Sequence, residues 1–75
     1  MSNPSKIMKR ITQAEAKTGD FIDSYDNKDA FLIASHRLEK AAKLKRIDRK
    51  LVYIILPIEG KTMWQVFLMP KTWKE

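Results

Sequence analysis

The residues best suited to chemistry in this chain are a run of positive side chains that ends at a run without charge. The cations are Lys43, Lys45, Arg46, Arg49 and Lys50, and the uncharged stretch LVYIIL, residues 51–56, comes directly after them. Ammonium and guanidinium groups spaced in this way can bind the phosphates of a nucleic-acid backbone. This basic run is therefore the first candidate site.

The sequence predicts a nucleic-acid-binding surface at the end of a long helix. Its residues are Lys40, Lys43, Lys45, Arg46, Arg49, Lys50 and Lys61. Contacts from such residues to phosphates fix position without reading sequence, so DNA and RNA are not distinguished. Trp73, where exposed, can stack on a base. A second interpretation stays open, because Lys and Arg beside an apolar strand also oppose aggregation and suit a helix C-terminus.

The sequence favours binding over catalysis. It has one histidine, no cysteine and only two glycines, which form no phosphate-binding loop, and we expect no cofactor and no small-molecule substrate. A metal-free ribonuclease is the weaker alternative, because cleavage of a phosphate ester needs a proton shuttle and positive charge. The residues that would serve it are His36, Arg37, Arg46, Arg49 and Tyr53.

Acidic residues recur at every third position in the first half of the chain: Asp20, Asp23, Asp26 and Asp29. The spacing lacks the ligand pattern and the glycine of a calcium loop. We interpret these carboxylates as turn formers and helix-start charges, and we expect no metal site.

Charge is unevenly distributed along the 75 residues, whose net charge is +6. Residues 1–11 carry +3, residues 12–29 carry −3 and residues 30–75 carry +6. The basic part predicts attraction to nucleic acid or to an acidic protein. The absence of cysteine excludes a disulfide. No apolar run is long enough to cross a bilayer or resembles a signal peptide, so we expect no membrane association and a cytoplasmic, intracellular location.

The chain length predicts one small α+β domain over residues 1–75, with loose ends at 1–5 and 71–75. A long helix is expected at about 28–47, because that segment lacks Gly and Pro and carries an apolar stripe. The stripe consists of Phe31, Ala34, Leu38, Ala41 and Ala42, and Ile33 and Leu44 lie off it.

The N-terminal helical segment has two alternatives. Asn3 can cap a helix that starts at Pro4 and runs to Gly19. Alternatively, residues 6–11 form a third strand, and a short helix begins after Thr12. Thr12 and Glu15 have the spacing of a capping box, which belongs to the second alternative.

Residues 19–29 are predicted to be a connector between the N-terminal helical segment and the long helix. Acidic residues and turn formers surround its apolar residues Phe21, Ile22 and Tyr25, which are expected to pack inward. Asp26 or Asn27 is expected to cap the long helix.

The C-terminal part predicts an antiparallel β-hairpin packed on the long helix, with strands at about 51–58 and 62–69 and a turn at Glu59–Gly60. A two-residue loop pairs Ile55 with Trp64, Tyr53 with Val66 and Leu51 with Leu68. A four-residue loop shifts the pairs but keeps these six residues on one face of the hairpin. A three-residue loop instead places Trp64, Val66 and Leu68 on the same face as Val52, Ile54 and Leu56.

Both faces of this hairpin are apolar in any register, and one helix covers only one of them. The second face needs the N-terminal segment, a third strand, a second copy of the chain or a different protein. The alternative function is therefore a protein-binding module, an inhibitor or adaptor such as mobile elements encode, acting through this face or a strand edge. Its predicted interface residues are Val52, Ile54, Leu56, Met63, Phe67, Met69 and Trp73.

Overall fold

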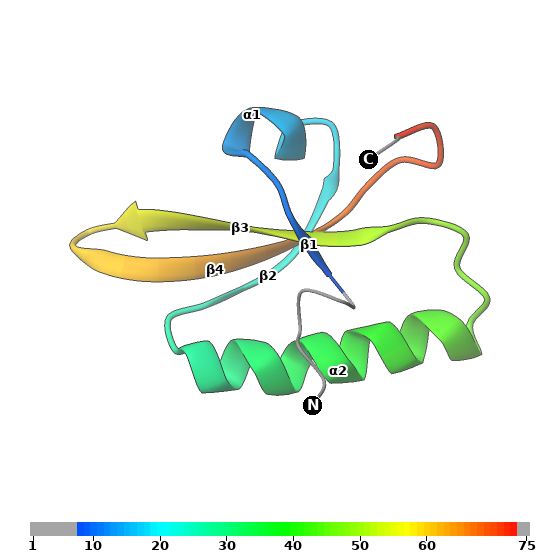
Figure 1. Ribbon diagram of the computed structural model, residues 1–75, viewed down its shortest axis with the longest axis horizontal. Helices are drawn as coiled ribbons and strands as arrows, with labels where there is room; N and C mark the ends of the chain where they lie inside the picture. Colours follow the sequence, from blue (N-terminus) through cyan, green and yellow to red (C-terminus); the bar gives the residue numbers. More distant parts are fainter. Residues whose placement is uncertain (1–7, 74–75) are drawn as a thin grey trace.

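The computed structural model describes residues 8–73, which form three layers (Figure 1). A sheet lies between a long helix on one side and a short helix with the C-terminal segment on the other. The elements are β1 (Lys9–Arg10), α1 (Gln13–Ala16), β2 (Asp20–Tyr25), α2 (Lys28–Leu44), β3 (Leu51–Ile58) and β4 (Lys61–Leu68). The α+β class is confirmed. Within residues 8–73, no helix is long and apolar enough to cross a membrane.

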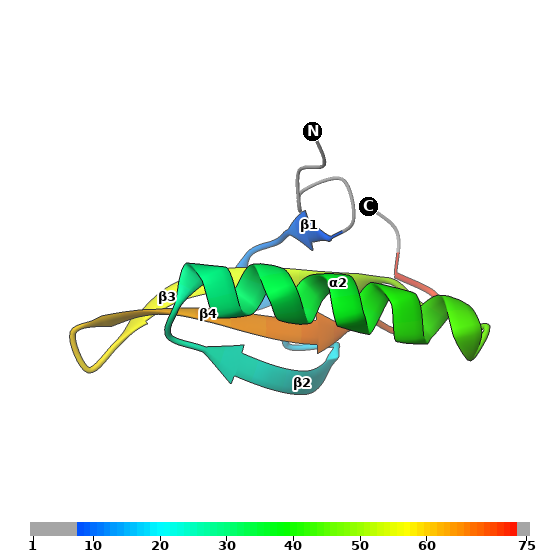
Figure 2. The same ribbon diagram turned by 90° about the horizontal axis from the view of Figure 1, so that it is seen from below.

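The C-terminal hairpin forms the centre of a four-stranded sheet with the order β1-β3-β4-β2. Strand β1 pairs in parallel with β3, and β2 pairs antiparallel with β4. Strands β2 and β3 therefore run in the same direction with β4 between them, and α2 connects them across one face of the sheet (Figure 2).

The hairpin has the two-residue loop that the sequence allows. Glu59 and Gly60 both have positive φ angles, 51° and 79°, which is the geometry of the type I′ turn that matches the twist of paired strands. The pairs of the two-residue loop, from Ile55 with Trp64 to Leu51 with Leu68, are confirmed. The three-residue alternative is wrong.

The core beneath α2 is centred on Phe31, which is 2% exposed and lies 4.9 Å from the ring of Tyr53, centroid to centroid. Its other buried members are Met8, Leu51 and Val66, with Tyr25, Leu38, Ala42, Trp64 and Leu68 partly buried around them. Ile33 and Leu44 are exposed, as their place off the stripe indicates.

The chain itself covers part of the second face of the hairpin. Val52, Ile54 and Met69 are at most 2% exposed, and the side chains packed with them include Ile11, Ala16 and Trp73. Val52, Ile54 and Met69, three of the predicted interface residues, are therefore buried within the chain, whereas Leu56, Met63 and Phe67 are half-buried. Trp73 is part of this packing and is not in a loose end.

The capping box of α1 is confirmed. The hydroxyl oxygen of Thr12 accepts a hydrogen bond from the Glu15 amide at 3.2 Å, and the Glu15 carboxylate accepts one from the Thr12 amide at 3.1 Å. A continuous helix reaching Gly19 is wrong, because Lys9–Arg10 is a strand and α1 has only four residues. The predicted cap at Asn3, the loose end at 1–5 and residues 6–7 lie outside the described residues.

The predicted connector at 19–29 is wrong, because Asp20–Tyr25 is strand β2. Phe21 and Ile22 are 56% and 38% exposed, so they do not pack inward as expected. Aspartate disfavours strands, but pairing with β4 and an edge-to-face contact between Phe21 and Phe67, with centroids 5.7 Å apart, outweigh this preference.

The long helix is confirmed with adjusted bounds. Asn27 is its N-cap, and its side chain accepts a hydrogen bond from the Ala30 amide at 3.1 Å. The helix ends at Leu44, before the predicted 47, because Arg46 has a left-handed backbone with φ 53°.

Arg49 ties together the ends of β2 and β4 at the entrance to β3. Its Nη2 donates to the Asp20 carboxylate at 2.6 Å and to the Leu68 carbonyl at 3.1 Å, and its Nε donates to the Met69 carbonyl at 2.8 Å. The Arg49 side chain is 33% exposed. Because a planar guanidinium serves these three acceptors at once, lysine cannot replace it.

We expect Arg49→Met to lower the free energy of unfolding by about 2 kcal/mol, because it leaves two partly buried carbonyls without their charged donor. Arg37→Met is the matched control, since Arg37 is exposed on α2 and its loss should change stability by less than about 0.5 kcal/mol. Urea unfolding measures both. Equal losses in the two variants would contradict the role of Arg49.

Candidate nucleic-acid interface

Most of the predicted cations gather where α2 ends and the chain turns toward β3. We call this surface the basic corner, and it consists of Lys40, Lys43, Lys45, Arg46 and Lys50, all exposed. It occupies the last turns of α2 and the connector to β3, at the right-hand end of the molecule in Figure 1.

A Schellman motif shapes the basic corner. The Ile47 amide donates to the Ala42 carbonyl at 2.9 Å, and the Arg46 amide donates to the Lys43 carbonyl at 3.1 Å. Arg46 occupies the position that is usually glycine, because a Cβ in the left-handed region meets the neighbouring carbonyl. The strain for a non-glycine residue there is roughly 1 kcal/mol.

Two predicted phosphate ligands do not belong to the basic corner. Arg49 is engaged with Asp20 and two backbone carbonyls. Lys61 pairs with Ile58 beside the hairpin turn. Lys50 precedes the other end of the eight-residue strand β3, so the length of the strand separates Lys61 from Lys50 by about 25 Å. The structure therefore brings together five of the predicted cations and separates Lys61 from them.

A hollow of about 290 Å³ opens beside the basic corner, and we call it the sheet-end pocket. Its polar lining residues are Asp48, Arg49, Lys50 and Lys71, and Trp73 forms part of its wall. The Trp73 amide donates to the Pro70 carbonyl at 2.9 Å, which closes residues 70–73 into a turn. The sequence pattern does not reveal this pocket, because Lys71 and Trp73 come after the last strand without any periodic signal.

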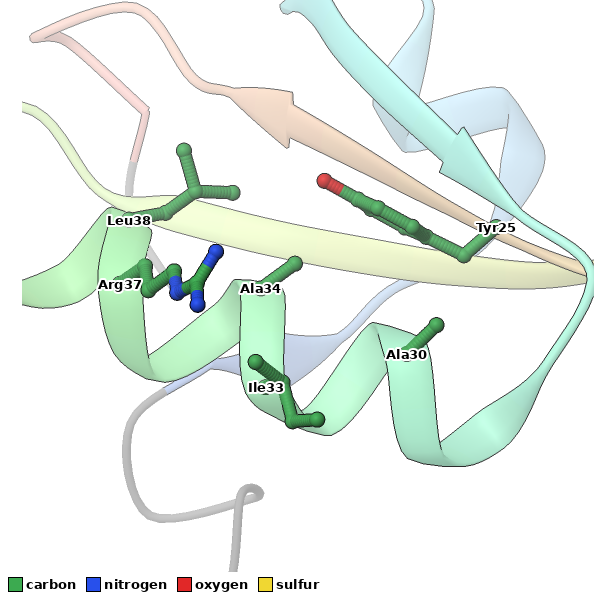
Figure 3. Close-up of a pocket in the computed structure, with 6 residues that line it drawn as sticks. All are labelled: Tyr25, Ala30, Ile33, Ala34, Arg37 and Leu38. Carbon is green, nitrogen blue, oxygen red and sulfur yellow. The ribbon is translucent and has the colours of Figure 1, made fainter.

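A second concavity, of about 450 Å³, lies between α2 and β2, and we call it the helix–edge groove. Tyr25 reaches over it from β2, and α2 contributes Ala30, Ile33, Ala34, Arg37 and Leu38 (Figure 3). Strand β2 is the last strand on this side of the sheet, so no described strand pairs with its outer edge. An apolar groove thus runs beside an open strand edge.

Tyr25 supplies the hydroxyl at the helix–edge groove. Burial raises the pKa of this hydroxyl above its usual value, and the nearby Asp23 carboxylate adds to the shift by opposing a phenolate charge. A tyrosine hydroxyl is protonated at neutral pH even without this shift, so Tyr25 can donate a hydrogen bond there.

The described residues do not bring the predicted ribonuclease constellation together. Tyr53 packs against Phe31 beneath α2, Arg49 is engaged at the sheet end, and His36 is exposed on α2. Residues 8–73 also contain no group of three or more acidic or histidine side chains that could hold a metal ion.

Comparison with known proteins adds no relative. No family model matches the chain, and neither the curated proteins nor the solved structures contain a match. Function has to be inferred from the surfaces of the protein itself.

We expect Arg46→Gly to raise the free energy of unfolding by about 1 kcal/mol, because it relieves the left-handed strain. Lys45→Gly is the control, since Lys45 has an ordinary right-handed conformation with φ −86° and gains nothing from glycine. Urea unfolding compares the two variants. A loss of stability at both positions would refute the strain at Arg46.

Proposed function

We propose that the basic corner of this protein binds the phosphate backbone of a nucleic acid. The observation that carries the proposal is Arg46, an exposed arginine held in a backbone conformation that glycine would adopt with less strain. Strained residues concentrate at functional sites. Lys43 and Lys45 already supply positive charge at the helix C-terminus and near the apolar strand. Neither helix stabilisation nor protection from aggregation therefore requires an arginine at position 46.

The charge distribution supports the same surface. Asp26 and Asp29 lie at the start of α2, whereas Lys40, Lys43 and Lys45 lie near its end, and the helix between the two ends has 17 residues. A polyanion is therefore steered toward the end of the helix. The partial negative charge of a helix C-terminus opposes an anion, so the side chains themselves must supply the attraction.

The expected binding is electrostatic and does not depend on sequence. Phosphate contacts release counterions, so affinity falls with salt in proportion to the number of phosphates neutralised. For about four contacts by the basic corner, we expect log K to fall with log salt with a slope of roughly −3 to −4.

The test reverses charge at the basic corner with a control of equal net charge. We expect Lys43→Glu/Lys45→Glu to reduce affinity for a random-sequence oligonucleotide by at least about tenfold at low salt and to flatten the salt slope. Lys28→Glu/Lys61→Glu makes the same change in net charge at exposed sites far from the corner. Fluorescence anisotropy at two salt concentrations measures both.

The two double variants have the same net charge, so they differ only in where the charge is reversed. A large loss in the first variant and a small loss in the second support the proposal. Equal losses would mean that only net charge matters, and an oligonucleotide that does not bind the unaltered protein at low salt would refute the function.

A second candidate function is protein binding at the helix–edge groove, because the groove runs along the open edge of β2. An extended peptide can add to such an edge and place an apolar side chain in the groove. The acids on and beside β2 that are not paired with Arg49, Asp23 and Asp26, favour a basic peptide and disfavour a second copy of β2.

We expect a peptide of alternating Lys and Leu to shift the backbone NMR signals of Asp20–Tyr25, and one of alternating Glu and Leu to leave them unchanged. Ile33→Ser should weaken the Lys–Leu peptide about tenfold, because it removes an apolar wall of the groove. Leu44→Ser is the control, since Leu44 is exposed on the same helix outside the groove. Equal effects of the two substitutions would contradict this candidate.

A further inference from the structure

The sheet-end pocket combines three features that neither the basic corner nor the groove has together. It is concave, it is lined by positive side chains, and it contains an aromatic ring, that of Trp73. Its volume of about 290 Å³ is close to the lower limit of roughly 300 Å³ for pockets that hold small ligands. The space therefore suits one nucleotide unit and not a folded partner.

The pocket is continuous with the basic corner. Ile47 lines the pocket and comes directly after Arg46 in the chain, and Lys50 belongs to both surfaces. A strand whose phosphates lie on the basic corner thus reaches the pocket within the length of the connector, residues 47–50.

The surroundings of Trp73 favour an aromatic ligand. The side chain is half-buried, packs against the core cluster that includes Met69, and also lines the pocket. An indole fixed in this way offers a rigid surface on which a base can stack, and such stacking tolerates any base. In a duplex the base faces are already stacked on each other, so only an unpaired base can reach Trp73.

The charges of the pocket are mixed, with a positive excess. Lys50 and Lys71 line it together with one carboxylate, that of Asp48, and the guanidinium of Arg49, which also lines it, is engaged with Asp20. Asp48 forms an exposed ion pair with Lys71 at 3.5 Å. An entering phosphate would compete with Asp48 for Lys71, so this carboxylate limits the affinity of the pocket.

We propose that the sheet-end pocket holds one unpaired nucleotide, with its base stacked on Trp73 and its phosphate beside Lys50 and Lys71. This inference rests on the proposed function, because the basic corner holds the neighbouring phosphates of the same strand. It adds a preference for single-stranded nucleic acid over duplex.

The test separates base from backbone. In a Trp64→Phe background, Trp73 is the only remaining tryptophan, since Trp64 lies on the other face of the sheet beneath α2. The protein is titrated with oligothymidylate, with an abasic strand of the same length and with a duplex. We expect oligothymidylate to quench Trp73 fluorescence and to bind about tenfold more tightly than the abasic strand.

Three variants test the individual groups. Trp73→Leu should lower the affinity for oligothymidylate to that for the abasic strand, and Trp73→Phe should retain part of the preference because it keeps a ring. Asp48→Asn should raise the affinity for oligothymidylate at least about twofold, because it removes a repulsive charge and releases Lys71. Circular dichroism shows whether each variant is folded. Where a variant does not fold, the comparison of oligothymidylate with the abasic strand on the Trp64→Phe protein still tests the stacking site.

The outcomes distinguish the two proposals. Equal affinity for both strands without quenching overturns the stacking site and leaves backbone binding intact. A preference for duplex over oligothymidylate also overturns it. Failure of every strand to bind at low salt refutes backbone binding, and the stacking site with it.

Discussion

The β3–β4 hairpin carries apolar side chains on both faces, and the rest of the structure depends on the need to cover both. Phe31 and its neighbours on α2 cover one face, and Ile11, Ala16 and Trp73 cover part of the other. Because α2 must lie along the hairpin, its C-terminal end comes to the end of the sheet at which Leu51 begins β3. The cations that come after the apolar stripe are therefore collected at one corner of the molecule.

The same requirement explains why residues 70–73 pack on the sheet. A domain of 75 residues has a marginal core, and a large aromatic residue is an efficient way to extend it. Trp73 packs on the core cluster that includes Val52 and Met69, and in the same position it forms part of the wall of a charged hollow. Stability and a candidate binding surface thus depend on a single side chain.

Features specified by local sequence were predictable. The Glu59–Gly60 turn and the alternation on either side of it determine the hairpin, and Thr12 with Glu15 specifies the start of α1. Strand β2, Asp20–Tyr25, was not predictable, because its acidic residues are typical of loops and only pairing with β4 makes it a strand. The end of α2 at Leu44 was missed for a related reason, since the left-handed position that follows, usually a glycine, is occupied by Arg46. Among the candidate site residues, charge identified the basic corner but could not separate Arg49, whose partners lie 19 to 29 residues away along the chain.

The strand order sets the sequence of events when the chain is synthesised. Both outer strands, β1 and β2, leave the ribosome before the hairpin with which they pair, since residues 9–25 precede residues 51–68. Strand β1 pairs with β3 and β2 pairs with β4, so each outer strand waits for a partner in the second half of the chain. The brevity of β1 and the acidic side chains of β2 then have a use beyond the folded state. Short strands and acidic side chains are features that oppose pairing of an exposed strand with another chain.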